Sequence, residues 1–113
     1  MNEAVGIIEM FGFVTAITAA DAAAKAADVK IIAIDSNKPA NAESVEVPLI
    51  MAVKMTGSVS AVKAAVEAGA RAAESVSGLI NTHIIARPTG DAMKMAKRIS
   101  VGRDKVGHIK NNA

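Results

Sequence analysis

Few residues in this 113-residue chain have the potential for catalysis, and they are widely spaced. Two histidines occur, His83 in an apolar segment and His108 in a basic segment, and cysteine is absent. The histidines, serines and carboxylates do not recur at spacings that suggest a catalytic triad or a metal site, and the glycines form no phosphate fingerprint. "TGSVS" opens a helix whose free N–H groups can hold an anion, as every helix start can. We therefore predict no catalytic residue, no metal ligand and no cofactor, and interpret His83 as a structural strand residue.

Two cationic residues stand in settings that suit a protein contact better than catalysis. Lys25 follows Asp21 by four residues in a helical pattern, a spacing worth about 0.3 kcal/mol as a salt bridge. Arg87 precedes Pro88, which biases Arg87 toward an extended conformation with a projecting side chain. Taken alone, Lys25 is interpreted as a solvated helix residue and Arg87 as an ordinary turn residue.

Periodicity predicts the elements that position these residues. Strands are expected over residues 3–13, 30–35, 49–56 and 81–86, the first of them buried on both faces because it is almost continuously apolar. Helical patterns cover residues 14–29, 57–76 and 91–99, with Gly12 ending or bending the first strand, Ser58 as an N-cap and Gly78 marking a helix end. The order β-α-β-β-α-β predicts an α+β, ferredoxin-like fold, with a four-stranded antiparallel sheet, both main helices on one face, and a short C-terminal helix.

Composition constrains the core and the cellular setting. Apolar residues make up 51% of the chain, but Phe11 and Phe13 are its only aromatic residues, so we expect one domain with a core of aliphatic side chains and Met. Asp21, Lys25 and Asp28 interrupt the longest apolar run, which falls short of the roughly 18 residues of a membrane span. The N-terminus lacks the pattern of a secretory signal, so no membrane association is expected.

The charge is unevenly distributed. Residues 1–93 contain seven Lys or Arg against ten Asp or Glu, whereas residues 94–113 contain six against one. We therefore divide the chain into a main domain, residues 1–92, and a basic C-terminal helix and tail, residues 93–113. No aromatic residue for base stacking accompanies the basic cluster, so nucleic acid is not an expected partner and the tail is interpreted as solvated.

Three stretches in order resemble one known family: "EAVGIIEMFGF" with "AADAAAKAADV", then "TGSVSAVKAAVEAGARAA", then "THIIARPTGD". Together they are similar to the single-domain, hexamer-forming shell proteins of bacterial microcompartments, over about residues 3–91. The resemblance implies a structural protein of the bacterial cytoplasm, a homohexamer that forms a flat tile. Such tiles join each other and other shell proteins into a shell around encapsulated enzymes, and small metabolites cross a central pore.

The resemblance also assigns candidate residues at the tile edge. It matches Lys25 to the family's edge lysine and Arg87 to the arginine that reaches the neighbouring tile, with Asp28 and Pro88 beside them. A lysine stem can lie along a flat apolar surface, and a guanidinium can donate to several carbonyls. Asp28 stands where the family commonly has Asn, which implies a more salt-dependent contact, and Thr89 stands where it commonly has His.

The same resemblance predicts a modified pore. In the family a short Gly- and Ser-rich turn between the second and third strands lines the six-fold axis. Here residues 36–47 replace it, an insertion of about nine residues, and loops this long are uncommon without a function. Lys38, Asn41 and Glu43 are expected nearest the axis, where rings of charge would filter solutes; the alternative is a solvent loop without a role. The predicted pore-loop residues are Ser36, Asn37, Lys38, Pro39, Ala40, Asn41, Ala42 and Glu43.

A trimeric regulatory protein that binds a small molecule is the alternative function. The nitrogen-signalling trimers share the β-α-β-β-α-β order and carry a long partner-contacting loop after the second strand. "AAKAADV" and "ARPTGD" distinguish the two interpretations, because they match the shell family and have no recognised counterpart in the regulators.

Overall fold

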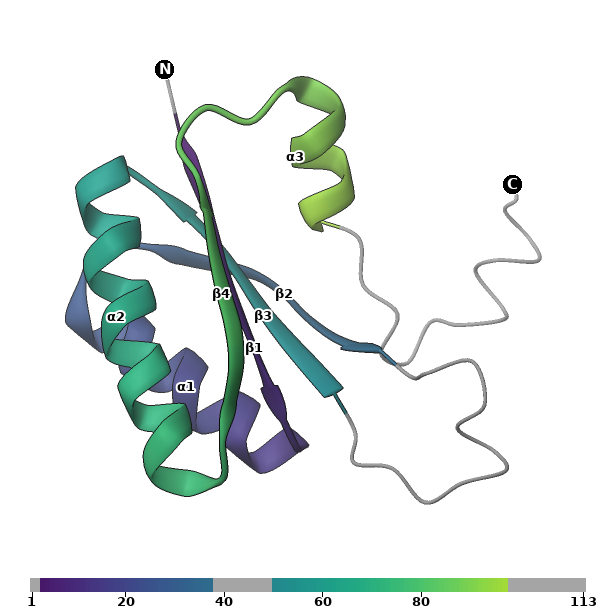
Figure 1. Ribbon diagram of the computed structural model, residues 1–113. Coiled ribbons are helices and arrows are strands. Elements are labelled where there is room, and N and C mark those ends of the chain that lie inside the picture. Colours follow the sequence, from purple (N-terminus) through teal and green to yellow (C-terminus); the bar gives the residue numbers. More distant parts are fainter. Residues whose placement is uncertain (1–2, 38–49, 98–113) are drawn as a thin grey trace.

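The computed structural model describes residues 3–37 and 50–97, which form one sheet with helices on both of its sides (Figure 1). The sheet has the strand order β2-β3-β1-β4, and every neighbouring pair is antiparallel. The elements are β1 (Ala4–Phe11), α1 (Phe13–Ala26), β2 (Lys30–Asn37), β3 (Ile50–Gly57), α2 (Val59–Val76), β4 (Leu79–Ile85) and α3 (Gly90–Lys97). The predicted fold class is therefore confirmed, including the short third helix.

Helices α1 and α2 pack side by side on one face of the sheet, while α3 lies on the other side (Figure 1). Helix α1 contacts β1, β2 and β3, whereas α2 contacts β1, β3 and β4. The two main helices thus divide the sheet between them, with α1 toward the β2 edge and α2 toward the β4 edge. None of the described helices is both long and apolar enough to cross a membrane.

Local sequence explains where the main helices begin. Gly12 has a φ of 92°, a left-handed conformation that glycine adopts without strain, and it turns the chain from β1 directly into α1. The Ser58 hydroxyl accepts a hydrogen bond of 3.1 Å from the Ala61 N–H, so it is the N-cap of α2, as predicted. Helix α2 ends at Val76, two residues before Gly78.

A pair of hydroxyl groups joins three elements near the C-terminal end of α2. Ser77 donates from its Oγ to the backbone oxygen of Phe11 at 3.0 Å, and its Oγ lies 2.9 Å from Thr15 Oγ1. Thr15 is buried, so this hydrogen bond satisfies a polar group that would otherwise be costly to bury. The end of β1, the first turn of α1 and the end of α2 are thereby tied together.

The core lies between the sheet and its two main helices and is aliphatic, as the composition predicts. Its largest fully buried side chains are Ile8, Met10, Met51, Met55, Val53 and Val62. Alanines on α1 allow close packing, and Gly6 and Gly69 allow closer approach still. A Cβ on Gly6 would lie 2.7 Å from side-chain atoms of both Val62 and Val66.

Two strand predictions need correction. Strand β1 is buried on both faces only over Ala4–Gly6, after which the residues facing away from α1 and α2 are partly or fully exposed. Strand β2 was predicted to end at Asp35 but pairs with β3 as far as Asn37, because the ladder continues opposite Met51 and Ile50. The predicted division between a main domain, residues 1–92, and a basic C-terminal segment, residues 93–113, falls inside helix α3. That division stays a prediction.

Candidate assembly surfaces

Lys25 lies in the last turn of α1, where a cation interacts favourably with the negative end of the helix dipole. Its Nζ is 2.9 Å from Asp21 Oδ2, which forms the predicted i,i+4 salt bridge. The side chains of Lys25 and Asp21 are 76% and 60% exposed, so their salt bridge contributes little to stability. Lys25 can therefore leave Asp21 and bind another acceptor at little cost. Asp28 is also exposed and lies between α1 and β2.

Arg87 and Pro88 occupy the bend between β4 and α3, and Arg87 is exposed. The next residue has a structural role that sequence reasoning missed: Thr89 Oγ1 accepts a hydrogen bond of 3.0 Å from the Ala92 N–H. Thr89 therefore caps α3 in the manner of an N-cap threonine. The sequence holds the signal for this cap, since a threonine directly before an amphipathic run is typical of a helix N-cap.

The candidate residues lie at two opposite ends of the sheet. The start of β2, which follows α1 and Lys25, lies beside the end of β3, and the end of β4, which leads to Arg87, lies at the same end of the sheet. Because β2 and β4 are opposite edge strands, Lys25 and Arg87 belong to opposite corners of that end. The connection from β2 to β3 leaves from the other end, about 25 Å away along eight-residue strands.

The predicted pore-loop residues fall into two groups. Ser36 and Asn37 are the last residues of β2, opposite Met51 and Ile50 of β3. The remaining six predicted residues, Lys38 to Glu43, lie outside the described residues.

Two pairs of polar side chains lie on the sheet face that points away from α1 and α2, and the sequence did not predict them. Lys54 Nζ donates to Asp35 Oδ2 at 3.2 Å, and both side chains are largely shielded from solvent, at 13% and 23% exposed. His83 Nε2 is 3.8 Å from Glu9 Oε1, and this histidine is half exposed, not packed inside the fold. Strand register brings these partners together, and register is not readable from a single sequence.

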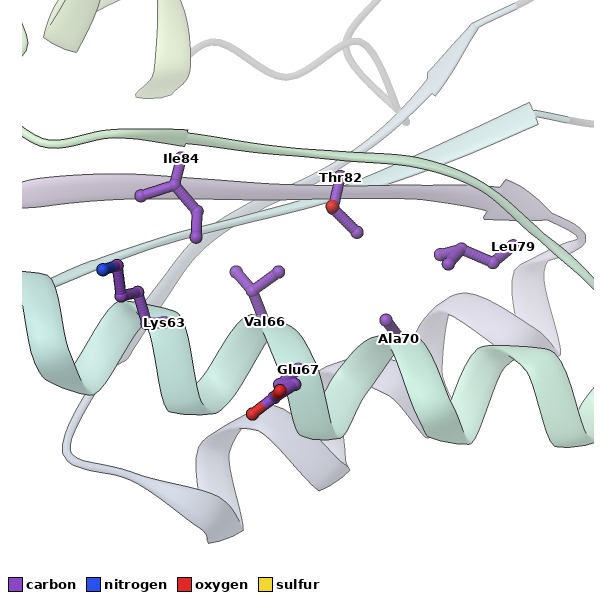
Figure 2. A pocket seen from close by; sticks show the side chains of 7 residues that line it. All are labelled: Lys63, Val66, Glu67, Ala70, Leu79, Thr82 and Ile84. Carbon is purple, nitrogen blue, oxygen red and sulfur yellow. The ribbon is translucent and has the colours of Figure 1, made fainter.

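Among the described residues no group of His, Cys, Asp or Glu could hold a metal ion. A groove of about 450 Å³ lies between α2 and β4 (Figure 2). Val66, Ala70, Leu79 and Ile84 project into it, while the Glu67 carboxylate points away. Its full lining is Lys63, Val66, Glu67, Ala70, Leu79, Thr82 and Ile84, hereafter the α2–β4 groove.

Comparison with known proteins identifies the family. Residues 4–88 match the model of the BMC domain family, so the chain belongs to that family. It is 40% identical over 89 residues to the bacterial microcompartment shell protein EutM of Salmonella typhimurium, which covers 79% of this chain and 83% of that protein. It is also 38% identical over 94 residues to the shell protein PduA of Citrobacter freundii, which covers 83% of this chain and 91% of the relative.

A carboxysome relative and a solved structure agree with this assignment. The carboxysome shell protein CsoS1 of Prochlorococcus marinus is 46% identical over 89 residues, 78% of each chain. The crystal structure of a microcompartment protein from Desulfitobacterium hafniense matches with a TM-score of 0.62 and 26% identity, over 80% of this chain. The match covers 44% of the Desulfitobacterium hafniense chain, so this chain aligns with less than half of that protein's length. The predicted family resemblance is confirmed.

Proposed function

We propose that this protein is a structural subunit of a bacterial microcompartment shell and that six copies form a flat hexagonal tile. Its family and its relatives, which are shell proteins by name, support the shell role and a location in the shell within the bacterial cytoplasm. Neighbouring tiles, other shell proteins and encapsulated enzymes are its partners, and no catalytic step is assigned to it.

The observation that carries this proposal is the separation of candidate residues to the two ends of the sheet. Lys25 and Arg87 stand at opposite corners of one end, whereas the β2–β3 connection leaves from the other. In a ring with the strands running outward, the connection would surround the axis and both cations would reach the rim. An exposed lysine and an exposed arginine at two corners suit a contact in which one tile donates to the carbonyls of the next.

Analytical ultracentrifugation with electron microscopy tests the tile. We expect a hexamer that builds sheets or tubes, and a Lys25→Ala variant that stops at the hexamer. Lys94→Ala, which removes an exposed lysine from α3, is the matched control and should assemble like the wild type. A trimer or monomer that is indifferent to Lys25 would contradict the proposal and would direct attention to the regulatory alternative, which no comparison favours.

The extended connection is proposed to modify the pore. β2 ends at Ser36 and Asn37 and β3 begins at Ile50, so in the proposed hexamer the connection between them would gather around the axis. We expect deletion of residues 38–42 to raise the permeability of reconstituted shells to small metabolites. Unchanged passage of both an anionic and a cationic solute would show that the connection does not control the pore.

A further inference from the structure

The turn between α1 and β2, residues 27–29, adjoins two of the candidate edge residues. Lys25 lies in the last turn of α1, and Asp28 is exposed at the centre of the α1–β2 turn. On either side of Asp28, Ala27 and Val29 pack against the core, and the Val29 N–H donates to the Ala27 carbonyl at 2.9 Å. The α1–β2 turn is therefore tight and is held from inside the fold.

Gly57, the last residue of β3, lies against the backbone of this turn. A Cβ on Gly57 would lie 3.1 Å from the backbone oxygen of Asp28 and 3.2 Å from Val29 Cγ1. Both distances are shorter than ordinary van der Waals contact, so a side chain at Gly57 fits only if the turn moves by a few tenths of an ångström. The missing side chain of Gly57 thus determines how closely the α1–β2 turn approaches the end of β3.

The backbone conformation at Gly57 does not itself require glycine. Among the glycines that the structure describes, only Gly12 has a positive φ, so Gly57 has a conformation that other residues adopt without strain. Gly57 pairs with Ala4 in the ladder between β3 and β1, and glycine is a poor strand residue compared with alanine or valine. The fold therefore uses the space beside Gly57 and not its conformational freedom.

We infer that Gly57 is a positioning residue for the tile edge, because it determines where Lys25 and Asp28 stand relative to Arg87. The end of β3 is joined through β1 to the end of β4, which leads to Arg87, so moving the α1–β2 turn away from Gly57 changes this spacing. The inference rests on the proposed tile and names a residue that sets the geometry of its edge.

A lattice amplifies a small error in this geometry. A hexagonal tile has six edges, each shared by two tiles, so a penalty at one edge counts three times for each tile in a sheet. Because free energies of separate contacts add, a roughly twofold loss of affinity per edge becomes a roughly eightfold loss per tile. A displacement too small to unfold the subunit is therefore large enough to impede sheet growth.

Two substitutions at Gly57 separate displacement of the turn from strand propensity. Gly57→Ala adds one carbon at the crowded point, and Gly57→Val adds a larger side chain that strands favour more than alanine. We expect Gly57→Ala to raise the protein concentration needed for sheet growth roughly eightfold, and Gly57→Val to stop at the hexamer, whereas propensity alone predicts the better result for valine. Gly90→Ala, near Arg87, is the matched control, since a Cβ there meets no atom within 4 Å.

Sedimentation velocity measures the hexamer, and electron microscopy over a concentration series measures the sheets. We expect hexamers and native circular dichroism for Gly57→Ala and Gly90→Ala, because a positioning residue affects the contact between tiles and not the tile itself. Sheets of Gly57→Ala at the wild-type concentration, or loss of its hexamer, would overturn the inference, while a Lys25→Ala variant arrested at the hexamer upheld the proposed function. A wild-type protein that forms neither hexamers nor sheets would overturn both.

Discussion

The Gly69→Ala variant tests the packing between the two main helices. A Cβ at this position would lie 2.6 Å from Ile8 Cδ1 and 3.0 Å from the backbone oxygen of Ala19. The first contact is closer than real Cβ atoms approach, and Ile8 is fully buried, so its side chain has little room to move. The second contact is with the backbone of α1, which can yield only if the helix shifts.

Two opposing terms set the expected magnitude. Alanine in place of glycine inside a helix contributes about 1 kcal/mol of added stability through propensity alone. Overpacking a well-packed core costs about 1–3 kcal/mol, and two short contacts place Gly69 toward the upper part of that range. The net expectation is a loss of about 1–2 kcal/mol, or a Tm lower by roughly 4–16 °C at about 4–8 °C per kcal/mol.

The assay is equilibrium urea unfolding followed by circular dichroism, at one fixed protein concentration because association shifts apparent stability. Gly78→Ala is the control, since a Cβ there meets no atom within 4 Å and should change stability by less than about 0.5 kcal/mol. A Gly69→Ala variant more stable than the wild type would refute the argument, because it would show that helix propensity outweighs the close approach of α1 and α2.

Two further substitutions probe local interactions, each by the same unfolding measurement. Ser58→Ala removes the hydroxyl that accepts from the Ala61 N–H and should cost about 1 kcal/mol, whereas Ser58→Asp should restore the cap. Asp35→Asn weakens the shielded pair with Lys54 and should cost about 1–2 kcal/mol, and an unchanged stability would show that Lys54 finds an equivalent acceptor.

The sequence predicts the order and type of the elements because each has a strong period. The spacing of valines and alanines in α2 is helical, and its start follows from Ser58. The ends of the strands were predicted less well, since β2 runs to Asn37 only because β3 offers partners there. Pairing across strands is a tertiary property, which is also why the Lys54–Asp35 pair was not foreseen.

The sequence predicted some residues of the candidate surfaces but not the α2–β4 groove, because the groove also depends on tertiary packing. Family resemblance assigned Lys25 and Arg87, and the structure adds that they lie at opposite corners of one end of the sheet. Local sequence held the information on Thr89 as a helix cap. No local pattern indicates the α2–β4 groove, because its two walls are formed by elements whose separation depends on how α2 packs against the sheet.

The position of the β2–β3 connection has a consequence for how such a protein can diversify. The connection begins and ends on two paired strands that hold their register up to Asn37 and Ile50, so the ladder fixes both attachment points. Inserted residues need only span two neighbouring strand ends, and the entropic cost of a longer loop rises slowly with its length. In the proposed tile, the size of the pore and the spacing of the lattice would then vary independently, and new transport properties could arise without a change in the contacts between tiles.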